Sequence, residues 1–242
     1  SKNKEIDYTK INGLTHEELF GYFYETQKLS RKNNGWEFKY DEKDFFGNKL
    51  EFDLIDSSKG KVYAKKGDKF NTLIAKELKK DSVKNLFIDA DSLIGNFLSK
   101  DIFEKNNGII YFEAGDEISE NIIKFLDEKQ INEIDILKIN SNKQGSYIRD
   151  TFFADKNKNR SDAVTEIYKI LRPGEPPTLE AADKLFRSLF FDRERYDLSP
   201  VGRLKLNTRL NLKSNLEMRT LENPDIIQIV KYLAGLKDGV GH

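Results

Sequence analysis

Arginine is the side chain whose distribution most clearly indicates binding chemistry in this sequence. The chain uses lysine throughout, but of its ten arginines only Arg31 precedes residue 149. A guanidinium group is a planar, forked donor that suits carboxylates and phosphates. Residues 151–220 hold fourteen Lys and Arg against ten Asp and Glu. We therefore expect this half of the chain to contact a polyanion, with ion pairs inside the domain as the alternative.

Five cations of this region are candidate contacts to a phosphate backbone. Arg203 stands apart from the acidic residues around it, directly after Gly202, and its neighbours in "PVGRLKLNTRL" include two more cations. The start of a helix favours anions, so Arg203 and Lys205 are expected to reach a phosphate from one helix end. The candidate DNA-binding residues are Arg172, Arg195, Arg203, Lys205 and Arg209.

Residues suited to catalysis are scarce. The sequence has no cysteine and only two histidines, His16 and His242, which argues against a thiolate metal site, a histidine-centred metal site and a Ser-His-Asp triad. Asp89 and Asp91 follow an apolar run, and such a pair of carboxylates can chelate Mg²⁺, although acidic residues are also ordinary turn formers. No glycine-rich phosphate loop is present. We expect no metal site and no active site in this chain.

Composition limits the other possibilities. The 41 basic and 41 acidic residues cancel, so a case for nucleic acid must be local, and no apolar run approaches the length that spans a bilayer. The sequence starts at Ser1 and stops shortly after a glycine. We expect a soluble, cytoplasmic, monomeric chain, excised from a longer protein.

An internal repeat provides the first structural element. Residues 60–89 and 108–137 align with a shift of 48 residues, with identical Gly, Tyr, Gly and Asp residues and matching apolar positions. Each copy predicts a strand, a Gly-Asp turn, an amphipathic helix capped by Asn71 or Ser119, and a second strand. Two stacked copies would bury faces that neither could bury alone.

Helical patterns flank this repeat. "LTHEELFGYFYETQ" starts a helix with a Thr15…Glu18 capping box, and four more helices are expected after residue 140. Of these, one covers "RSDAVTEIYKIL" and one follows the cap Thr178, while Ser199 and Asn223 each precede a proline at a helix start. The predicted fold is α+β: a helical domain of residues 1–29 and 144–242, interrupted by an α/β module of residues 30–143.

A proline-rich corner joins two of the helices. "RPGEPPT" ends one helix, because Pro173 disfavours helical backbone at Arg172 and Gly174 permits a turn. Pro176 and Pro177 then fix φ ahead of the cap Thr178. The structural corner thus comprises Pro173, Gly174, Pro176, Pro177 and Thr178. It is expected to set one helix rigidly against the next.

Residues 163–210 closely resemble the lobe (β2) domain in the β subunit of bacterial DNA-directed RNA polymerase. The resemblance rests on "EIYKILRPGEPPTLEAADKLFRSLFFDRERYDLSPVGRLKLN" and extends more loosely over residues 10–242. The repeat region is similar to the lineage-specific insertion of proteobacterial lobes. Leu179 departs from the pattern, because many relatives carry arginine there.

The resemblance implies a function for the chain. The lobe would line the main channel and help to hold downstream duplex and non-template DNA, without being catalytic itself, and Mg²⁺ would lie on the β′ subunit. The implied partners are DNA, the α, β′ and ω subunits, sigma factor and, at the insertion, secondary-channel regulators, in the nucleoid-associated cytoplasm. Two alternatives remain open: a protein-interaction module that docks regulators, and a Mg²⁺-dependent phosphotransferase that uses Asp89 and Asp91.

Overall fold

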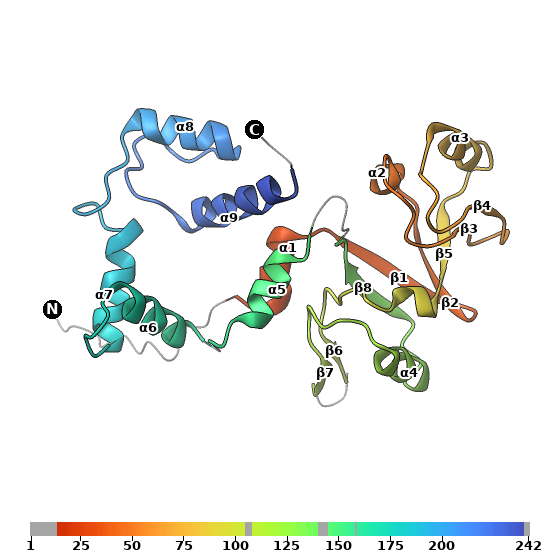
Figure 1. Ribbon diagram of the computed structural model, residues 1–242, viewed down its shortest axis with the longest axis horizontal. Coiled ribbons are helices and arrows are strands. Elements are labelled where there is room, and N and C mark those ends of the chain that lie inside the picture. The colour runs from red at the N-terminus through yellow and green to blue at the C-terminus, as the bar shows by residue number, and fades with distance from the viewer. Residues whose placement is uncertain (1–13, 105–107, 140–144, 158, 240–242) are drawn as a thin grey trace. The chain divides into compact units, whose positions relative to one another are not determined.

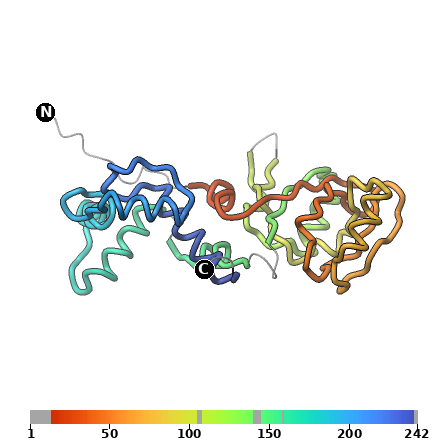
Figure 2. Tube along the Cα trace, turned by 90° about the horizontal axis from the view of Figure 1, so that it is seen from above, coloured from red at the N-terminus to blue at the C-terminus, as the bar shows by residue number. Residues whose placement is uncertain are grey.

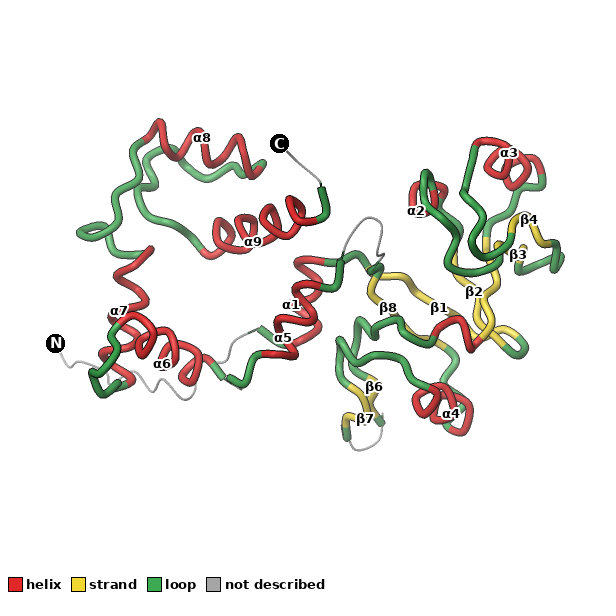
Figure 3. The backbone as a smooth tube through the Cα atoms, viewed as in Figure 1, coloured by secondary structure: helices red, strands yellow, loops and turns green. Residues whose placement is uncertain are grey.

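The computed structural model describes residues 14–104, 108–139, 145–157 and 159–239. They fall into two compact units (Figure 1). His16–Ser146 forms a unit that contains a sheet, and the second unit, which contains Tyr147 and the residues after it, is helical. All strands of the described residues belong to the first unit (Figure 3). The presence of both element types confirms the predicted α+β class.

The sheet unit is built on six antiparallel strands in the order β4-β3-β5-β2-β1-β8. Their bounds are β1 (Thr26–Lys32), β2 (Gly35–Lys39), β3 (Leu54–Asp56), β4 (Val62–Ala64), β5 (Asn85–Asp89) and β8 (Glu133–Leu137). A separate two-stranded ribbon pairs β6 (Ile102–Phe103) with β7 (Ile110–Phe112). Strands β4 and β5 belong to the first copy of the repeat and β8 to the second. Strands β2 and β1 lie between β5 and β8 in the sheet.

The core of this unit lies between the sheet and two amphipathic helices, α3 (Thr72–Lys80) and α4 (Glu120–Glu128). Trp36 on β2, Leu78 on α3 and Leu126 on α4 are almost completely buried in one apolar cluster. The unit also contains α1 (His16–Phe23), α2 (Glu42–Phe45) and the 3-10 helix η2 (Ala90–Leu93). The apolar spacing that predicted α3 and α4 thus marks their buried faces.

The two copies of the repeat have the same elements with the same 48-residue shift. Strand β7 corresponds to β4, α4 to α3 and β8 to β5. The correspondence also extends upstream of the segments aligned in the sequence, because η2 matches α2 at this shift. Each copy therefore spans 48 residues, 42–89 and 90–137, and the second follows the first directly.

The first boundary between the units differs from the predicted one. Residues 26–29 were expected in the helical domain, but they form the start of β1, which pairs with β2 and β8 near the middle of the sheet. The unit begins at His16 instead of residue 30, and it ends at Ser146. Sequence patterns missed this strand because "TQKLSRK" is polar at all but one position.

The helical unit contains five helices among its described residues. They are α5 (Tyr147–Ala154), α6 (Arg160–Leu171), α7 (Leu179–Phe190), α8 (Pro200–Leu210) and α9 (Asn223–Lys237). Helix α6 packs against α7, and α8 against α9. The tube in Figure 2 follows the same chain in a second view. Helix α9 starts one residue earlier than predicted, with Glu222 in place of Asn223 at its N-cap.

Candidate nucleic-acid interface

The proline-rich corner holds the turn from α6 to α7. Arg172 leaves the helix with ψ 66°, its N–H still donating to the Tyr168 carbonyl, and Gly174 takes a left-handed φ of 89°. On the far side, the Thr178 hydroxyl accepts a hydrogen bond from the Ala181 N–H at 3.2 Å and caps α7. The predicted Thr178 cap is therefore present. Helices α6 and α7 are connected by a short, internally bonded turn rather than by a loose loop.

Ion pairs around Asp183 also hold α6 against α7. Asp183 on α7 is buried and accepts hydrogen bonds from Arg160 on α6 and from Arg187 one turn further along α7. Burial raises the pKa of the Asp183 carboxyl, but the two guanidinium groups outweigh this effect and hold the pKa below its ordinary value. Arg160 and Arg187 thus form internal ion pairs, which is the alternative that the sequence left open for the arginines of this region.

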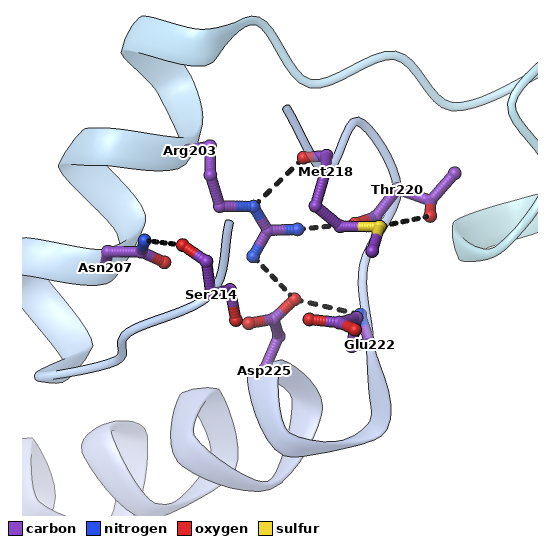
Figure 4. Close-up of polar contacts among 7 residues, drawn as sticks. All are labelled: Arg203, Asn207, Ser214, Met218, Thr220, Glu222 and Asp225. Carbon is purple, nitrogen blue, oxygen red and sulfur yellow. Dashed lines mark hydrogen bonds and ion pairs between the residues drawn. The ribbon is translucent and has the colours of Figure 1, made fainter. Parts of the chain in front are cut away.

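Arg203 lies in the interior of the unit, and its predicted role as an exposed DNA contact is wrong in this structure. Its side chain is completely buried. Figure 4 shows its guanidinium group among three acceptors: the Met218 carbonyl at 3.1 Å, the Asp225 carboxylate at 2.7 Å and the Thr220 carbonyl. Each of its three nitrogens donates a hydrogen bond inside the unit, and because the side chain is completely buried it cannot reach a phosphate.

The helical period explains this placement. Arg203, Asn207 and Leu210 lie three or four residues apart and form the buried side of α8. Beside Arg203, the Asn207 amide donates to the Ser214 carbonyl at 2.7 Å, and Asp225 also accepts from the Glu222 N–H at 2.8 Å (Figure 4). The site joins α8, the following connection and the start of α9. We call Arg203 and its three acceptors on Met218, Thr220 and Asp225 the clamp, because they hold these segments together.

The other four candidate cations are exposed. Lys205 and Arg209 lie four residues apart on the side of α8 opposite Arg203, and the Arg209 guanidinium carbon is 5.2 Å from the centre of the Tyr232 ring on α9. Within the described residues, neither side chain forms an ion pair with a carboxylate. Lys205 and Arg209 therefore present a cationic edge of α8 to solvent.

Arg172 and Arg195 lie on two turns of the same unit. Arg172 forms an exposed pair with Glu175 at 3.4 Å, a weak interaction that a phosphate can replace. Arg195 lies in the turn after α7, where its N–H donates to the Asp192 carbonyl. The neighbouring Asp197 is bound by Arg219 through two hydrogen bonds of 2.6 Å, which holds the turn in place.

Residues 116–242, just over half of the chain, match the family model described as RNA polymerase Rpb2, domain 2. The chain belongs to this family. It is 46% identical over 232 residues to the DNA-directed RNA polymerase subunit beta of Rhizorhabdus wittichii, covering 96% of this chain and 16% of that protein. The same subunit of Bartonella henselae is 47% identical over 229 residues, with 95% and 17% covered. The chain thus spans about one sixth of the length of these relatives.

One of the two acidic residues considered for metal binding, Asp89, occupies the same helix-start position as Asp41. Asp89 is the N-cap residue of η2, and Asp41, 48 residues earlier, caps α2 by accepting a hydrogen bond from the Lys43 N–H. His16 instead lies 3.2 Å from Glu113, and His242 lies outside the described residues. Among the described residues, no three His, Asp or Glu side chains are grouped to hold a metal ion.

Sequence reasoning missed the clamp around Arg203 although part of its signal was visible. The period of α8 placed Arg203 in line with Asn207 and Leu210, which marks a side that includes one clearly apolar residue. Its partner Asp225 is 22 residues away, and no local rule connects the two.

In the part of the chain that the structure describes, no helix is long and apolar enough to cross a membrane.

Proposed function

We propose that this chain is the lobe of an RNA polymerase β subunit, and that its helical unit lines the main channel and helps to hold downstream and non-template DNA. The membership of the Rpb2 domain 2 family and the printed names of the relatives support this proposal. The chain itself is not catalytic in this view. The Mg²⁺ ion, the α, β′ and ω subunits and sigma factor belong to the whole enzyme, in the nucleoid-associated cytoplasm.

The exposed side of α8 is the observation that carries the proposal. Lys205 and Arg209 extend from one helical face, and the clamp of Arg203 fixes that helix from its buried side. Phosphate contacts position a protein on DNA without reading its sequence, and a guanidinium group can form two parallel hydrogen bonds to one phosphate. Arg172 and Arg195 add two cations, one on the turn before α7 and one on the turn after it. The helical unit therefore offers a non-specific DNA contact on a rigid support.

The salt dependence of promoter-complex lifetime tests this proposal. Polymerase assembled with Lys205→Ala and Arg209→Ala in the β subunit should lose its open complexes faster than wild type, and the lifetime should depend less steeply on salt, because fewer counterions are displaced. The matched control is Lys39→Ala with Lys124→Ala, two exposed lysines of the sheet unit. Identical lifetimes for wild type and the α8 variant at every salt concentration would contradict the DNA role.

A second candidate function is a protein-interaction module in which the sheet unit docks transcription regulators. The exposed apolar side chains of the β6–β7 ribbon favour it, since Phe103, Ile109 and Ile110 are each about half exposed. Polymerase that lacks residues 16–146 should then open promoters normally and no longer respond to regulators. Loss of basal promoter opening in this deletion would contradict a purely docking role.

A further inference from the structure

The two copies of the repeat carry opposite charge. The first copy, residues 42–89, has eleven lysines and nine acidic residues, whereas the second copy, residues 90–137, has four lysines and eleven acidic residues. The copies share one backbone, so this difference is not a consequence of the fold. Comparison of the two copies therefore distinguishes charged residues that the shared backbone requires from charged residues that it does not require.

The shared backbone is visible at the turn that precedes each long helix. Gly67 and Gly115 both have φ 91°. The Asp68 carboxylate accepts from the Lys65 N–H at 2.8 Å, and the Asp116 carboxylate accepts from the Glu113 N–H at 2.9 Å. The same turn thus forms with lysine or with glutamate at its first position. The lysine charge contributes nothing that the turn requires.

Six lysines of the first copy form what we call the lysine face. All six are exposed, and none forms a side-chain ion pair within the described residues. Three lie in the turn and three on α3, where the helical period puts Lys76, Lys79 and Lys80 within an arc of about 100°. The lysine face comprises Lys65, Lys66, Lys69, Lys76, Lys79 and Lys80.

The equivalent positions of the second copy have mostly lost or reversed this charge. They are Glu113, Ala114, Glu117, Lys124, Asp127 and Glu128. Two of the acids act within the unit: Glu113 lies 3.2 Å from His16, and Asp127 pairs with Arg31 at 2.5 Å. The second copy therefore uses part of its charge internally. The first copy leaves all six lysines directed to solvent.

Stabilisation of α3 does not account for the lysines. Lys79 and Lys80 lie in its last turn, where a cation interacts favourably with the helix dipole. Helix α4 has the same length and ends with Asp127 and Glu128 in those positions. The helix thus forms with either sign of charge. The lysines of the lysine face are therefore available to an external anion.

We propose that the lysine face binds duplex DNA through its phosphates, as a second contact separate from the one on α8. Lysines on a turn and on the helix that follows it can each contact a phosphate, because ammonium groups bind phosphate as point charges. An acidic protein would need an apolar centre within such a charged rim, and Leu73 is the one large apolar side chain exposed on α3. The charge pattern therefore favours a nucleic acid.

The second copy supplies the test variant. Lys79→Asp with Lys80→Glu gives α3 the residues that α4 already has at these positions, so the chain should still fold. Fluorescence anisotropy of a labelled DNA duplex with the 242-residue chain, over a range of salt concentrations, should show weaker binding. The slope of log affinity against log salt should become shallower by up to about two, since each lost phosphate contact removes roughly 0.9.

The matched control is Lys39→Glu with Lys124→Glu, which changes the net charge equally at exposed lysines outside the lysine face. It should bind DNA more tightly than Lys79→Asp/Lys80→Glu does. Equal losses in both variants would overturn the proposal, because net charge alone would explain them. Unchanged DNA binding with weaker binding of a labelled poly-glutamate peptide would also overturn it, in favour of an acidic protein partner. The α8 variant of the proposed function leaves these lysines intact, so the two ideas fail independently.

Discussion

Arg203 on α8 and Asp225 in the first turn of α9 form an ion pair of 2.7 Å, and both side chains are completely buried. The pair connects two helices that no strand or disulfide joins among the described residues of the helical unit. A buried charge that loses its partner costs far more than an exposed one, because it cannot regain water. Substitution of either residue of this pair should therefore destabilise the helical unit.

Asp225→Asn should lower the free energy of unfolding of the helical unit by roughly 3–5 kcal/mol, because it leaves the Arg203 guanidinium buried without a counter-charge. Asp197→Asn is the matched control, since it breaks the exposed pair with Arg219 and should cost under about 1 kcal/mol. Denaturant titration followed by circular dichroism measures both. The single tryptophan, Trp36, lies in the sheet unit, so its fluorescence transition should not move. Equal effects of the two substitutions would contradict the clamp.

Acid should weaken the contact between α6 and α7. The pKa of Asp183 is lower in the folded chain than its ordinary value, so its contribution to stability is present above the unfolded pKa of about 4 and is lost as the pH falls through the folded value. Wild type should therefore melt above Asp183→Asn at neutral pH, and the difference in Tm should narrow below about pH 4. A difference that stays constant down to the folded pKa would argue against this ion pair.

A β-carbon at Gly174, in the turn between α6 and α7, should strain the backbone. Gly174→Ala should destabilise the helical unit by about 1–2 kcal/mol, because φ at this residue is 89° and the added atom meets no neighbour within 4 Å, which leaves backbone strain as the cost. Gly21→Ala is the control, since Gly21 is helical and equally unobstructed, and alanine there should stabilise by up to about 1 kcal/mol. The two Tm values should shift in opposite directions.

The two copies of the repeat should respond differently to loss of their helix caps. The Asn71 side chain accepts hydrogen bonds from the Leu73 and Ile74 N–H groups at the start of α3, whereas Ser119 makes no such bond to α4. Asn71→Ala should cost about 1 kcal/mol and Ser119→Ala a few tenths at most. Trp36 fluorescence during unfolding measures both. Equal losses of stability in the two variants would show that the hydrogen bonds of the Asn71 side chain do not stabilise α3.

Local rules predicted much of the fold, and their successes have a common cause. Helix α6 was predicted over its full length, and Thr178, Ser199 and Asn71 cap the helices expected of them, because capping depends on residues close in sequence. Strand β1 was missed because pairing with β8, about 105 residues later, forms it despite its polar sequence. Its first residues therefore lie in the sheet unit instead of the helical domain.

The candidate site shows the same limit. Exposure of Arg172, Arg195, Lys205 and Arg209 follows from their positions on turns or on the polar side of a helix. Arg203 was misplaced because its partner Asp225 is distant in sequence, and an arginine without a nearby carboxylate was taken as free. A helical projection of α8 would have placed Arg203 with Asn207 and Leu210, opposite the two cations that remain exposed.

The most direct measurement of the central claim is photo-crosslinking within a promoter complex. A benzophenone amino acid at Lys205 or Arg209 of the β subunit should crosslink to DNA in assembled polymerase, because the account places this side of α8 against phosphates. The same probe at Leu233, on an exposed apolar part of α9, should not. Crosslinks from positions 205 and 209 with none from 233 would support the account. Crosslinks only to protein from all three positions would contradict it.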